Sequence, residues 1–288
     1  MKTVKLVVCD IDGTLIRRGE PFPEAVAEAV KKLKRKGIAF SFASGRLPYM
    51  IQPYLDQMGL DVPYCACNGT LLMYGKKRLE SHPIAVGYLR PLIDAACKMD
   101  MTVLYAINGT EYCVMENDTV RRKRQERGHY HAIRPIEDDE WETLLVDKVN
   151  ILDEKGRMPL FADREREIMP VCDITHYGNE GLELVASGYG KEYGIRFLAR
   201  RFGVSTDEIL AIGDNENDIA MVTLAGIGGV VANGTREAKD CADIVATAEA
   251  GEGVAEIIGK ICLNAEKKGL SAQNIGLNSG RMPQEEKQ

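Results

Sequence analysis

Short apolar runs and amphipathic stretches alternate along the first part of the chain. The apolar runs at 4–9 and 38–43 each stop at a polar loop, which is typical of a buried strand. Residues 23–36 place apolar side chains on one helical face, and a second helix is expected over 47–58, before a short strand at 64–67. Strands that alternate with helices in this way predict a parallel sheet with helices on both faces.

The same alternation returns near the end of the chain. Residues 191–202 carry an apolar stripe at helical spacing, and apolar runs at 209–212, 229–232 and 243–245 predict three further strands. A helix over 254–263 would close this second region. Both regions are therefore expected to form one α/β core, built on a doubly wound, Rossmann-like parallel sheet.

The middle of the chain has a different pattern, in which helical stretches mix with short strands. The strands predicted there are 102–106, 111–115, 148–152, 172–177 and 181–185. Such mixing favours a separate α+β unit with a partly antiparallel sheet. We therefore expect a core domain in two parts, residues 1–82 and 187–270, interrupted by an inserted α+β cap domain at 83–186. Residues 271–288 are polar and aperiodic, and we expect a disordered tail there.

Composition and charge narrow the class of protein. The 288 residues are 45% hydrophobic and carry a net charge of −6 with a pI near 5.5, which argues against a nucleic-acid partner. No apolar stretch approaches the roughly 18 residues of a membrane span or the roughly 7–15 of a secretory signal. The eight cysteines are scattered, and we expect free thiols in a reducing environment. The expectation is a cytoplasmic protein with no membrane partner.

Polar loops follow the carboxyl ends of the predicted core strands. Residues 10–14 read Asp-Ile-Asp-Gly-Thr, residues 44–46 read Ser-Gly-Arg, and residues 213–218 read Gly-Asp-Asn-Glu-Asn-Asp. Lys191 opens a late core helix. Because ligands bind beyond the carboxyl ends of the strands in a doubly wound sheet, we expect these segments to converge on one point.

Convergence would place Asp10, Asp12, Asp214 and Asp218 in one crevice. Close carboxylates repel and raise one another's pKa unless a cation is present. Mg²⁺ prefers oxygen ligands and keeps several waters, so a hard divalent cation suits this set. Lys191 would add a compact positive charge for a phosphoryl oxygen. Stabilising anionic oxygens around phosphorus is most of what phosphoryl transfer demands.

These segments resemble, in their order, the four motifs of the haloacid dehalogenase-like phosphatases. Residues 10–14 are similar to the first motif, Ser44 to the second, Lys191 to the third and residues 213–218 to the fourth. The sequences Ser44-Gly45-Arg46 and Asn68-Gly69, with a large insertion between the second and third motifs, resemble the Cof-like subfamily with its larger α/β cap. One departure is Glu192, because many relatives have Gly after the motif lysine.

The resemblance implies roles for these residues. Asp10 would attack phosphorus and become an aspartyl-phosphate, and Asp12 would protonate the leaving alcohol and then activate water. Mg²⁺ would be held by Asp10, Asp214 and the backbone carbonyl of Asp12. The remaining implied residues are Ser44, Gly45, Lys191 and Asn217 for the phosphate, Asp218, Gly13 and Thr14 in support, and Arg46 and Asn68 as possible substrate contacts. A side chain at Gly13 would crowd a backbone that turns sharply under the phosphate.

Structural alternatives exist for several residues. Ser44 could cap the following helix, Asn68-Gly69 is first of all a hairpin-turn sequence, and the basic run 121–127 indicates a solvated helix face. His129 and His131 are more typical of a surface or hinge feature than of a metal site, because no cysteine or carboxylate pattern accompanies them.

The sequence therefore predicts a Mg²⁺-dependent phosphatase that hydrolyses small phosphate monoesters through an aspartyl-phosphate. The resemblance points to sugar phosphates or phosphorylated cofactors as substrates. A phosphomutase on the same scaffold is the nearest alternative, because it would use the same core motifs. A non-catalytic sensor of a phosphorylated metabolite is a further alternative, although it would need neither the acid at Asp12 nor a lid of about a hundred residues.

Overall fold

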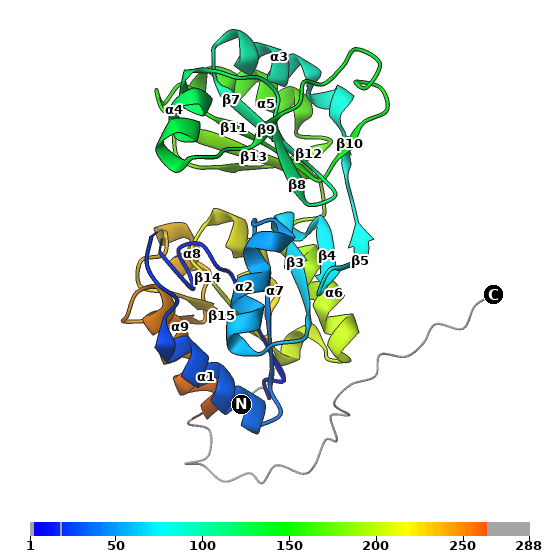
Figure 1. The fold of residues 1–288 in the computed structure, drawn as a ribbon. Helices are drawn as coiled ribbons and strands as arrows, with labels where there is room; N and C mark the ends of the chain where they lie inside the picture. Colours follow the sequence, from blue (N-terminus) through cyan, green and yellow to red (C-terminus); the bar gives the residue numbers. More distant parts are fainter. Residues whose placement is uncertain (1–2, 18, 264–288) are drawn as a thin grey trace, which may run out of the picture.

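The computed structural model describes residues 3–17 and 19–263, which form a lower body, the core, and an upper body, the cap, in Figure 1. The predicted tail at 271–288 and the end of the predicted core at 264–270 lie outside the described residues. Within the described ranges, every helix is too short or too polar to cross a membrane.

The core is built on a five-stranded parallel sheet in the order β16-β15-β14-β1-β2. Its strands are β1 (Leu6–Cys9), β2 (Ala39–Phe42), β14 (Ile209–Gly213), β15 (Ile227–Val230) and β16 (Ile244–Val245). Leu6 of β1 pairs with Ala39 of β2 on one side and with Ile209 of β14 on the other. The carboxyl ends of the central strands therefore lie side by side at one edge of the sheet.

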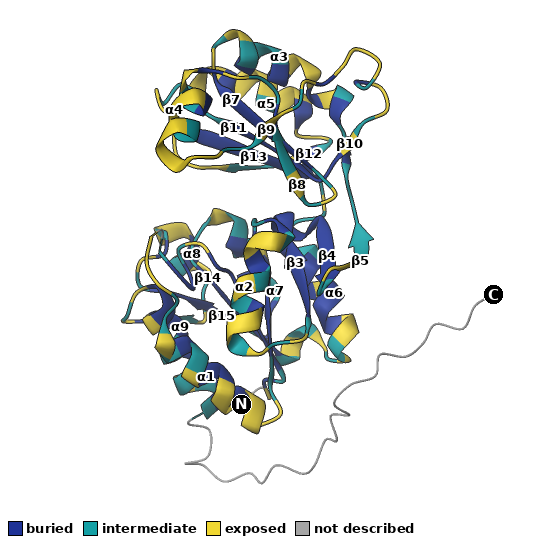
Figure 2. Cartoon of the chain, viewed as in Figure 1, coloured by how far each residue is buried: buried dark blue, intermediate teal, exposed yellow. Residues whose placement is uncertain are grey.

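Helices cover both faces of this sheet, as predicted. They are α1 (Glu24–Arg35), α2 (Pro48–Met58), α6 (Lys191–Phe202), α7 (Ile219–Leu224), α8 (Arg236–Asp240) and α9 (Ala250–Ile258). Side chains alternate along β1, so that Val7 and Cys9 pack with α1 and α9, whereas Leu6 and Val8 pack with α6 and α7. Figure 2 shows β14 and β15 as buried and the outward side of α1 as exposed.

A small antiparallel sheet extends the core beside β2. Its strands are β3 (Pro63–Ala66), β4 (Leu71–Tyr74) and β5 (Lys77–Ser81). The strand predicted at 64–67 therefore belongs to this sheet, and it touches the parallel sheet through a bridge between Ala43 and Cys65. The hairpin predicted at Asn68-Gly69 is confirmed, because Asn68 and Gly69 have φ values of 56° and 111° between the antiparallel β3 and β4.

The cap contains a six-stranded sheet in the order β12-β13-β11-β7-β8-β9. The strands are β7 (Thr102–Ile107), β8 (Thr110–Cys113), β9 (Ala132–Ile133), β11 (Lys148–Leu152), β12 (Cys172–His176) and β13 (Gly181–Ala186), with β6 (Ile84–Ala85) and β10 (Leu145–Val146) as a separate pair. The helices are α3 (Arg90–Lys98), α4 (Asp118–Arg127) and α5 (Ala162–Ile168). The pairing is antiparallel except between β8 and β9.

Strand β11 has two different faces. Val149 and Ile151 join the apolar cluster with α3 and α5. Alternation directs Lys148 and Asn150 to the opposite face, and Lys148 reaches the core, where its Nζ donates to the carbonyl oxygen of Gly45 at 2.9 Å. The polar face of the cap sheet therefore looks toward the core.

Two segments of the chain connect the core to the cap. His82 in the first segment and Tyr189 in the second stack with ring centroids 3.7 Å apart, and Tyr193 of α6 packs edge-on against both rings. These aromatic contacts join the two segments close to the predicted domain boundaries at 82/83 and 186/187. The exact boundaries remain proposals.

Candidate active site

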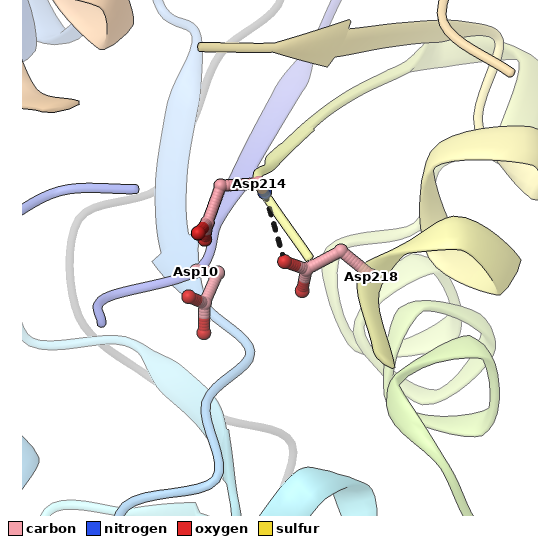
Figure 3. A group of neighbouring side chains, drawn as sticks. All are labelled: Asp10, Asp214 and Asp218. Atoms are coloured by element: carbon pink, nitrogen blue, oxygen red, sulfur yellow. Dashed lines mark hydrogen bonds between the residues drawn. The ribbon is translucent and has the colours of Figure 1, made fainter. Parts of the chain in front are cut away.

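Three aspartates gather where β1 and β14 end. Asp10 follows β1, Asp214 follows β14, and Asp218 lies four residues further along, so the parallel pairing of the two strands brings them together. One carboxylate oxygen from each lies within 4.8 Å of the others. Figure 3 shows the side chains of Asp10 and Asp214 adjacent to each other, with the carboxylate of Asp218 pointing toward them.

Lys191 links two of these carboxylates. It is the first residue of α6, and its Nζ donates to Oδ1 of Asp10 at 2.7 Å and to Oδ1 of Asp218 at 2.5 Å. Burial alone would lower the pKa of Lys191, but the charges of Asp10 and Asp218 outweigh it and raise the pKa. Lys191 is therefore a fixed positive charge beside the carboxylate of Asp10, and the presence of Glu192 after it does not prevent this placement.

Asp218 organises the loop that carries Asp214. Its Oδ2 accepts hydrogen bonds from the backbone N–H groups of Asp214, at 2.9 Å, and Asn215, at 3.1 Å, the first of which is dashed in Figure 3. With Oδ1 bonded to Lys191, both oxygens of this fully buried side chain already have protein partners. Asp218 is thus suited to positioning the loop and the lysine.

The cluster carries more negative charge than Lys191 balances. Burial, followed by the charges of Asp218 and Asp214, raises the pKa of Asp10 well above its usual range, although Lys191 opposes this shift. Burial and the charge of Asp218 raise the pKa of Asp214 to about 6. Within the described part of the chain, no hydrogen bond reaches Oδ2 of Asp10 or Oδ2 of Asp214. Hard oxygen donors with uncompensated charge fit Mg²⁺.

Gly13 and Thr14, in the loop that follows β1, position the side chain of Asp214. The hydroxyl of Thr14 donates to Oδ1 of Asp214 at 2.5 Å. Gly13 has φ +84°, and a Cβ at this position would lie 2.3 Å from Oδ2 of Asp214. Only glycine leaves room here for that carboxylate.

Asp12 stands apart from the three aspartates. Its side chain is 61% exposed, and its two oxygens accept hydrogen bonds from Nε of Arg46 at 2.8 Å and from an Nη of Arg46 at 2.7 Å. Arg46 is held in turn by Tyr54, whose hydroxyl accepts a bond of 2.8 Å. The cluster of close carboxylates therefore contains three of the four predicted side chains, whereas Asp12 is paired with Arg46 and lines the same cavity as Asp10.

Ser44 and Gly45 follow β2 at the same edge of the sheet. Ser44 is buried, and its hydroxyl oxygen accepts a hydrogen bond of 3.3 Å from the backbone N–H of Arg46. Helix α2 begins at Pro48, four residues later, and its N-cap residue is Leu47, so Ser44 does not cap that helix. The alternative that Ser44 is a helix cap is wrong, because the loop runs past it before the helix starts.

Asn68 connects the core to the cap. Its Oδ1 accepts a hydrogen bond of 3.1 Å from Nδ2 of Asn217, and its Nδ2 donates to Glu183 on β13 of the cap. Glu183 also accepts a bond of 2.8 Å from Lys148. Sequence reasoning missed Lys148 and Glu183, although a lone acid inside the apolar run of 181–185 was a usable signal.

A cavity of about 330 Å³ lies between the two bodies. Its lining from the core includes Asp10, Asp12 and Arg46, and its lining from the cap includes Glu111, Lys148 and Asn150. His131 faces Glu111 from outside this set, at 3.2 Å, so the cap histidine does have a carboxylate neighbour. In the described ranges, the one group of three or more possible metal ligands is the aspartate cluster.

The core is a doubly wound sheet that carries a cluster of aspartates and a lysine, and an inserted α+β unit covers this cluster. This combination is typical of one class of hydrolase. The family model for haloacid dehalogenase-like hydrolases matches residues 7–258, and the chain belongs to this family. The predicted membership, including the Cof-like type of the family, is confirmed.

The individual relatives of this chain share only about a quarter of its residues or fewer. "Putative phosphatase YkrA" of Bacillus subtilis is 25% identical, with 90% of this chain and 98% of the relative covered. Pyridoxal phosphate phosphatase YbhA of Escherichia coli is 24% identical, with 89% of this chain and 98% of the relative covered. Among solved structures, the subclass IIB sugar phosphatase BT4131 has a TM-score of 0.74 at 21% identity and covers 89% of this chain and 98% of its own.

Proposed function

We propose that this hydrolase is a Mg²⁺-dependent phosphatase that cleaves small phosphate monoesters through an aspartyl-phosphate on Asp10. The observation that carries the proposal is the buried carboxylate of Asp10, which opens into the cavity and is bonded to Lys191 beside Asp214. A buried carboxylate with one oxygen free of protein donors is available as a nucleophile.

The metal would be held by Asp10, Asp214 and the backbone carbonyl of Asp12. When bound, Mg²⁺ would neutralise the charge that develops on the phosphoryl oxygens and draw the ester toward Asp10. Asp218 would contribute through Lys191 and the loop, because its own oxygens are occupied. Ser44, Gly45, Lys191 and Asn217 would bind the phosphoryl oxygens.

The reaction then has two steps. An oxygen of Asp10 bonds to phosphorus as the ester P–O bond breaks, and Asp12 gives a proton to the departing alcohol oxygen. Water next attacks phosphorus, Asp12 takes a proton from it, and the bond between phosphorus and Asp10 breaks to release phosphate. Arg46 donates hydrogen bonds to both oxygens of Asp12. At least one of these bonds must therefore break when substrate binds, before Asp12 can transfer a proton.

Small esters suit the size of the site. The cavity of about 330 Å³ is near the lower end of the roughly 300–1,000 Å³ typical of ligand sites. The names of relatives include a sugar phosphatase and a pyridoxal phosphate phosphatase, which supports a small phosphorylated metabolite as the partner. All eight cysteines are free thiols, which supports the proposed cytoplasmic location.

The test is phosphate release from para-nitrophenyl phosphate and from a panel of sugar and cofactor phosphates, with Mg²⁺ or with chelator. Release that requires Mg²⁺ is the expected result. Transfer of the phosphoryl group to a second sugar without release would favour a phosphomutase, and tight binding without turnover would favour a sensor. Failure of the folded, Mg²⁺-loaded protein to release phosphate from any ester would overturn the proposal.

Gly13→Ala is expected to lower kcat/KM for every ester by roughly 100-fold, because the new Cβ would push the carboxylate of Asp214 out of place. Gly203→Ala is the matched control. Gly203 also has a positive φ, +66°, but its Cβ would meet nothing within 4 Å, so it shares the backbone strain without the clash. Equal activity losses in the two variants would contradict the assigned role of Gly13.

A further inference from the structure

One lysine of the cap is bonded to the backbone of the core. Nζ of Lys148, on β11, donates to the carbonyl oxygen of Gly45 at 2.9 Å and to Oε2 of Glu183 at 2.8 Å. Lys148 is 6% exposed and Glu183 is 1% exposed. Burial alone would lower the pKa of Lys148, but the charge of Glu183 outweighs it and raises the pKa. A buried, charged amine therefore links a strand of the cap to a loop of the core.

The carboxylate that holds this lysine is itself held from both bodies. Oε2 of Glu183 accepts a hydrogen bond of 2.9 Å from the hydroxyl of Tyr177 in the cap, and Oε1 accepts one from Nδ2 of Asn68 in the core. A Cβ on Gly45 would lie 3.2 Å from Oε1 of Glu183, so the loop and the cap strand pack closely. This network fixes the position of the amine, which the flexible lysine side chain alone would not do.

Gly45 is the residue on which the cap contact acts. It lines the cavity together with Asp10, and the N–H of Ser44 just before it donates to the carbonyl oxygen of Cys65 at 3.1 Å. Within the described ranges, the N–H of Gly45 donates to no acceptor of the protein, so it is available to a phosphoryl oxygen. Because glycine has no Cβ, the peptide that follows it rotates at little steric cost. The bond from Lys148 restrains this rotation.

The planarity of the peptide extends the restraint to the next residues. The C=O of Gly45 and the N–H of Arg46 belong to one trans peptide, so they point in opposite directions. With the C=O turned to Lys148, the N–H of Arg46 donates to Oγ of Ser44 at 3.3 Å. Rotation of this peptide would break both bonds together. Lys148 therefore stabilises one conformation of the loop 44–46.

Resting on the proposed phosphatase function, we propose that Lys148 is a positioning residue for phosphoryl binding. It holds the backbone of Gly45 in the conformation whose N–H donates to a phosphoryl oxygen, and Glu183 holds Lys148 in place. Because Lys148 belongs to the cap, the loop has this support only while the cap lies against the core as it does here. The lysine acts through Gly45 and not on the leaving group, so its contribution is the same for every ester.

Lys148→Met tests this role. Methionine keeps an unbranched apolar stem but donates no hydrogen bond to Gly45. We expect kcat/KM to fall roughly 10- to 100-fold, by the same factor for para-nitrophenyl phosphate and for sugar phosphates, and Ki for inorganic phosphate to rise by a similar factor. Lys155→Met makes the same exchange in an exposed turn of the cap, and it should leave all of these quantities at their wild-type values.

A spectroscopic signature separates positioning from direct contact with the substrate. In protein labelled with ¹⁵N-glycine, the amide resonance of Gly45 is assigned by its absence in Gly45→Ala. This resonance should shift when inorganic phosphate and Mg²⁺ are added to the wild type, and the shift should be lost in Lys148→Met even at saturating phosphate. A shift that persists unchanged while phosphate affinity falls would mean that Lys148 contacts the ligand itself, and it would refute the positioning role.

A second variant addresses folding. Lys148→Met leaves the buried Glu183 without its cation and is expected to lose stability. If it does not fold, Lys148→Met/Glu183→Gln, which removes both charges, takes its place in the same measurements.

The outcomes distinguish this proposal from the proposed function. Wild-type kcat/KM in the folded variant, or a loss confined to some esters, would refute the role of Lys148 while leaving the phosphatase intact. A wild type without turnover on any ester would refute the function. In that case the phosphate titration decides the role of Lys148: a Gly45 shift that depends on Lys148 supports it, and a shift independent of Lys148, or none in the wild type, refutes it.

Discussion

Asp10→Asn is expected to reduce phosphate release from every ester by on the order of 10⁴-fold or more, because the substitution removes the proposed nucleophile. Lys191 holds Oδ1 of Asp10, and Asp218 is occupied by the same lysine and by two backbone N–H groups. An amide oxygen at position 10 can still accept the bond from Lys191 but is too weak a nucleophile. Steady-state phosphate release, with single-turnover detection of the phosphoenzyme, measures this effect.

Folding should survive this substitution. Burial raises the pKa of Asp10, so the ionised carboxylate is unfavourable in the folded protein and a neutral amide avoids that penalty. The melting temperature is therefore expected to stay near the wild-type value. Asp163→Asn on α5, where the aspartate is exposed and pairs with Arg166, is the matched control and should retain full activity. A fully active, folded Asp10→Asn variant would exclude the covalent route.

Removal of Mg²⁺ is expected to abolish turnover and to leave a protein whose stability depends on pH. Asp214 has a pKa of about 6 in the folded state, against about 3.9 in an unfolded chain. At Asp214 the folded state thus binds more protons than the unfolded state between these values, so the contribution of this residue to stability is fully present below about pH 4 and is lost as the pH rises through about 6. The loss attributable to Asp214 is at most about 3 kcal/mol.

Adding Mg²⁺ should oppose the loss of stability that Asp214 causes as the pH rises. Protons compete with the metal for Asp214, so Mg²⁺ should raise the melting temperature more at pH 8 than at pH 5. Melting curves with and without chelator across this range measure the effect. Asp214→Asn should remove both the response to Mg²⁺ and the part of the pH dependence that comes from this residue. Activity that persists in chelator, or an equal Mg²⁺ shift at both pH values, would contradict the metal assignment.

The core and its acidic loops could be predicted because each carries its own local signal. The strand at 148–152 and the helix at 191–202 have the bounds that alternation and helical spacing indicated. Strand β5 was missed because Lys77–Ser81 is polar and partly exposed, without a run of buried apolar positions. Its place in the sheet comes from pairing with β4 rather than from its own composition.

The contacts between core and cap could not be predicted in the same way. Asn68 and Glu183 are 115 residues apart in the sequence, and Lys148 and Gly45 are 103 apart. No local pattern states which cap strand faces the site or in which register. The ion pair between Arg46 and Asp12 could not be predicted either, because it depends on how the loops after two adjacent strands approach each other.

The two-faced strand β11 has a consequence for protein engineering. Its inward residues Val149 and Ile151 support the apolar interior of the cap, whereas positions 150 and 152 line the cavity. A library restricted to these two cavity positions would sample new substrate preferences while sparing the inward residues of the strand and every group proposed to bind the phosphoryl group. The same separation gives natural divergence a short route, because exchanges at alternate positions of one strand can redirect the enzyme without rebuilding its chemistry.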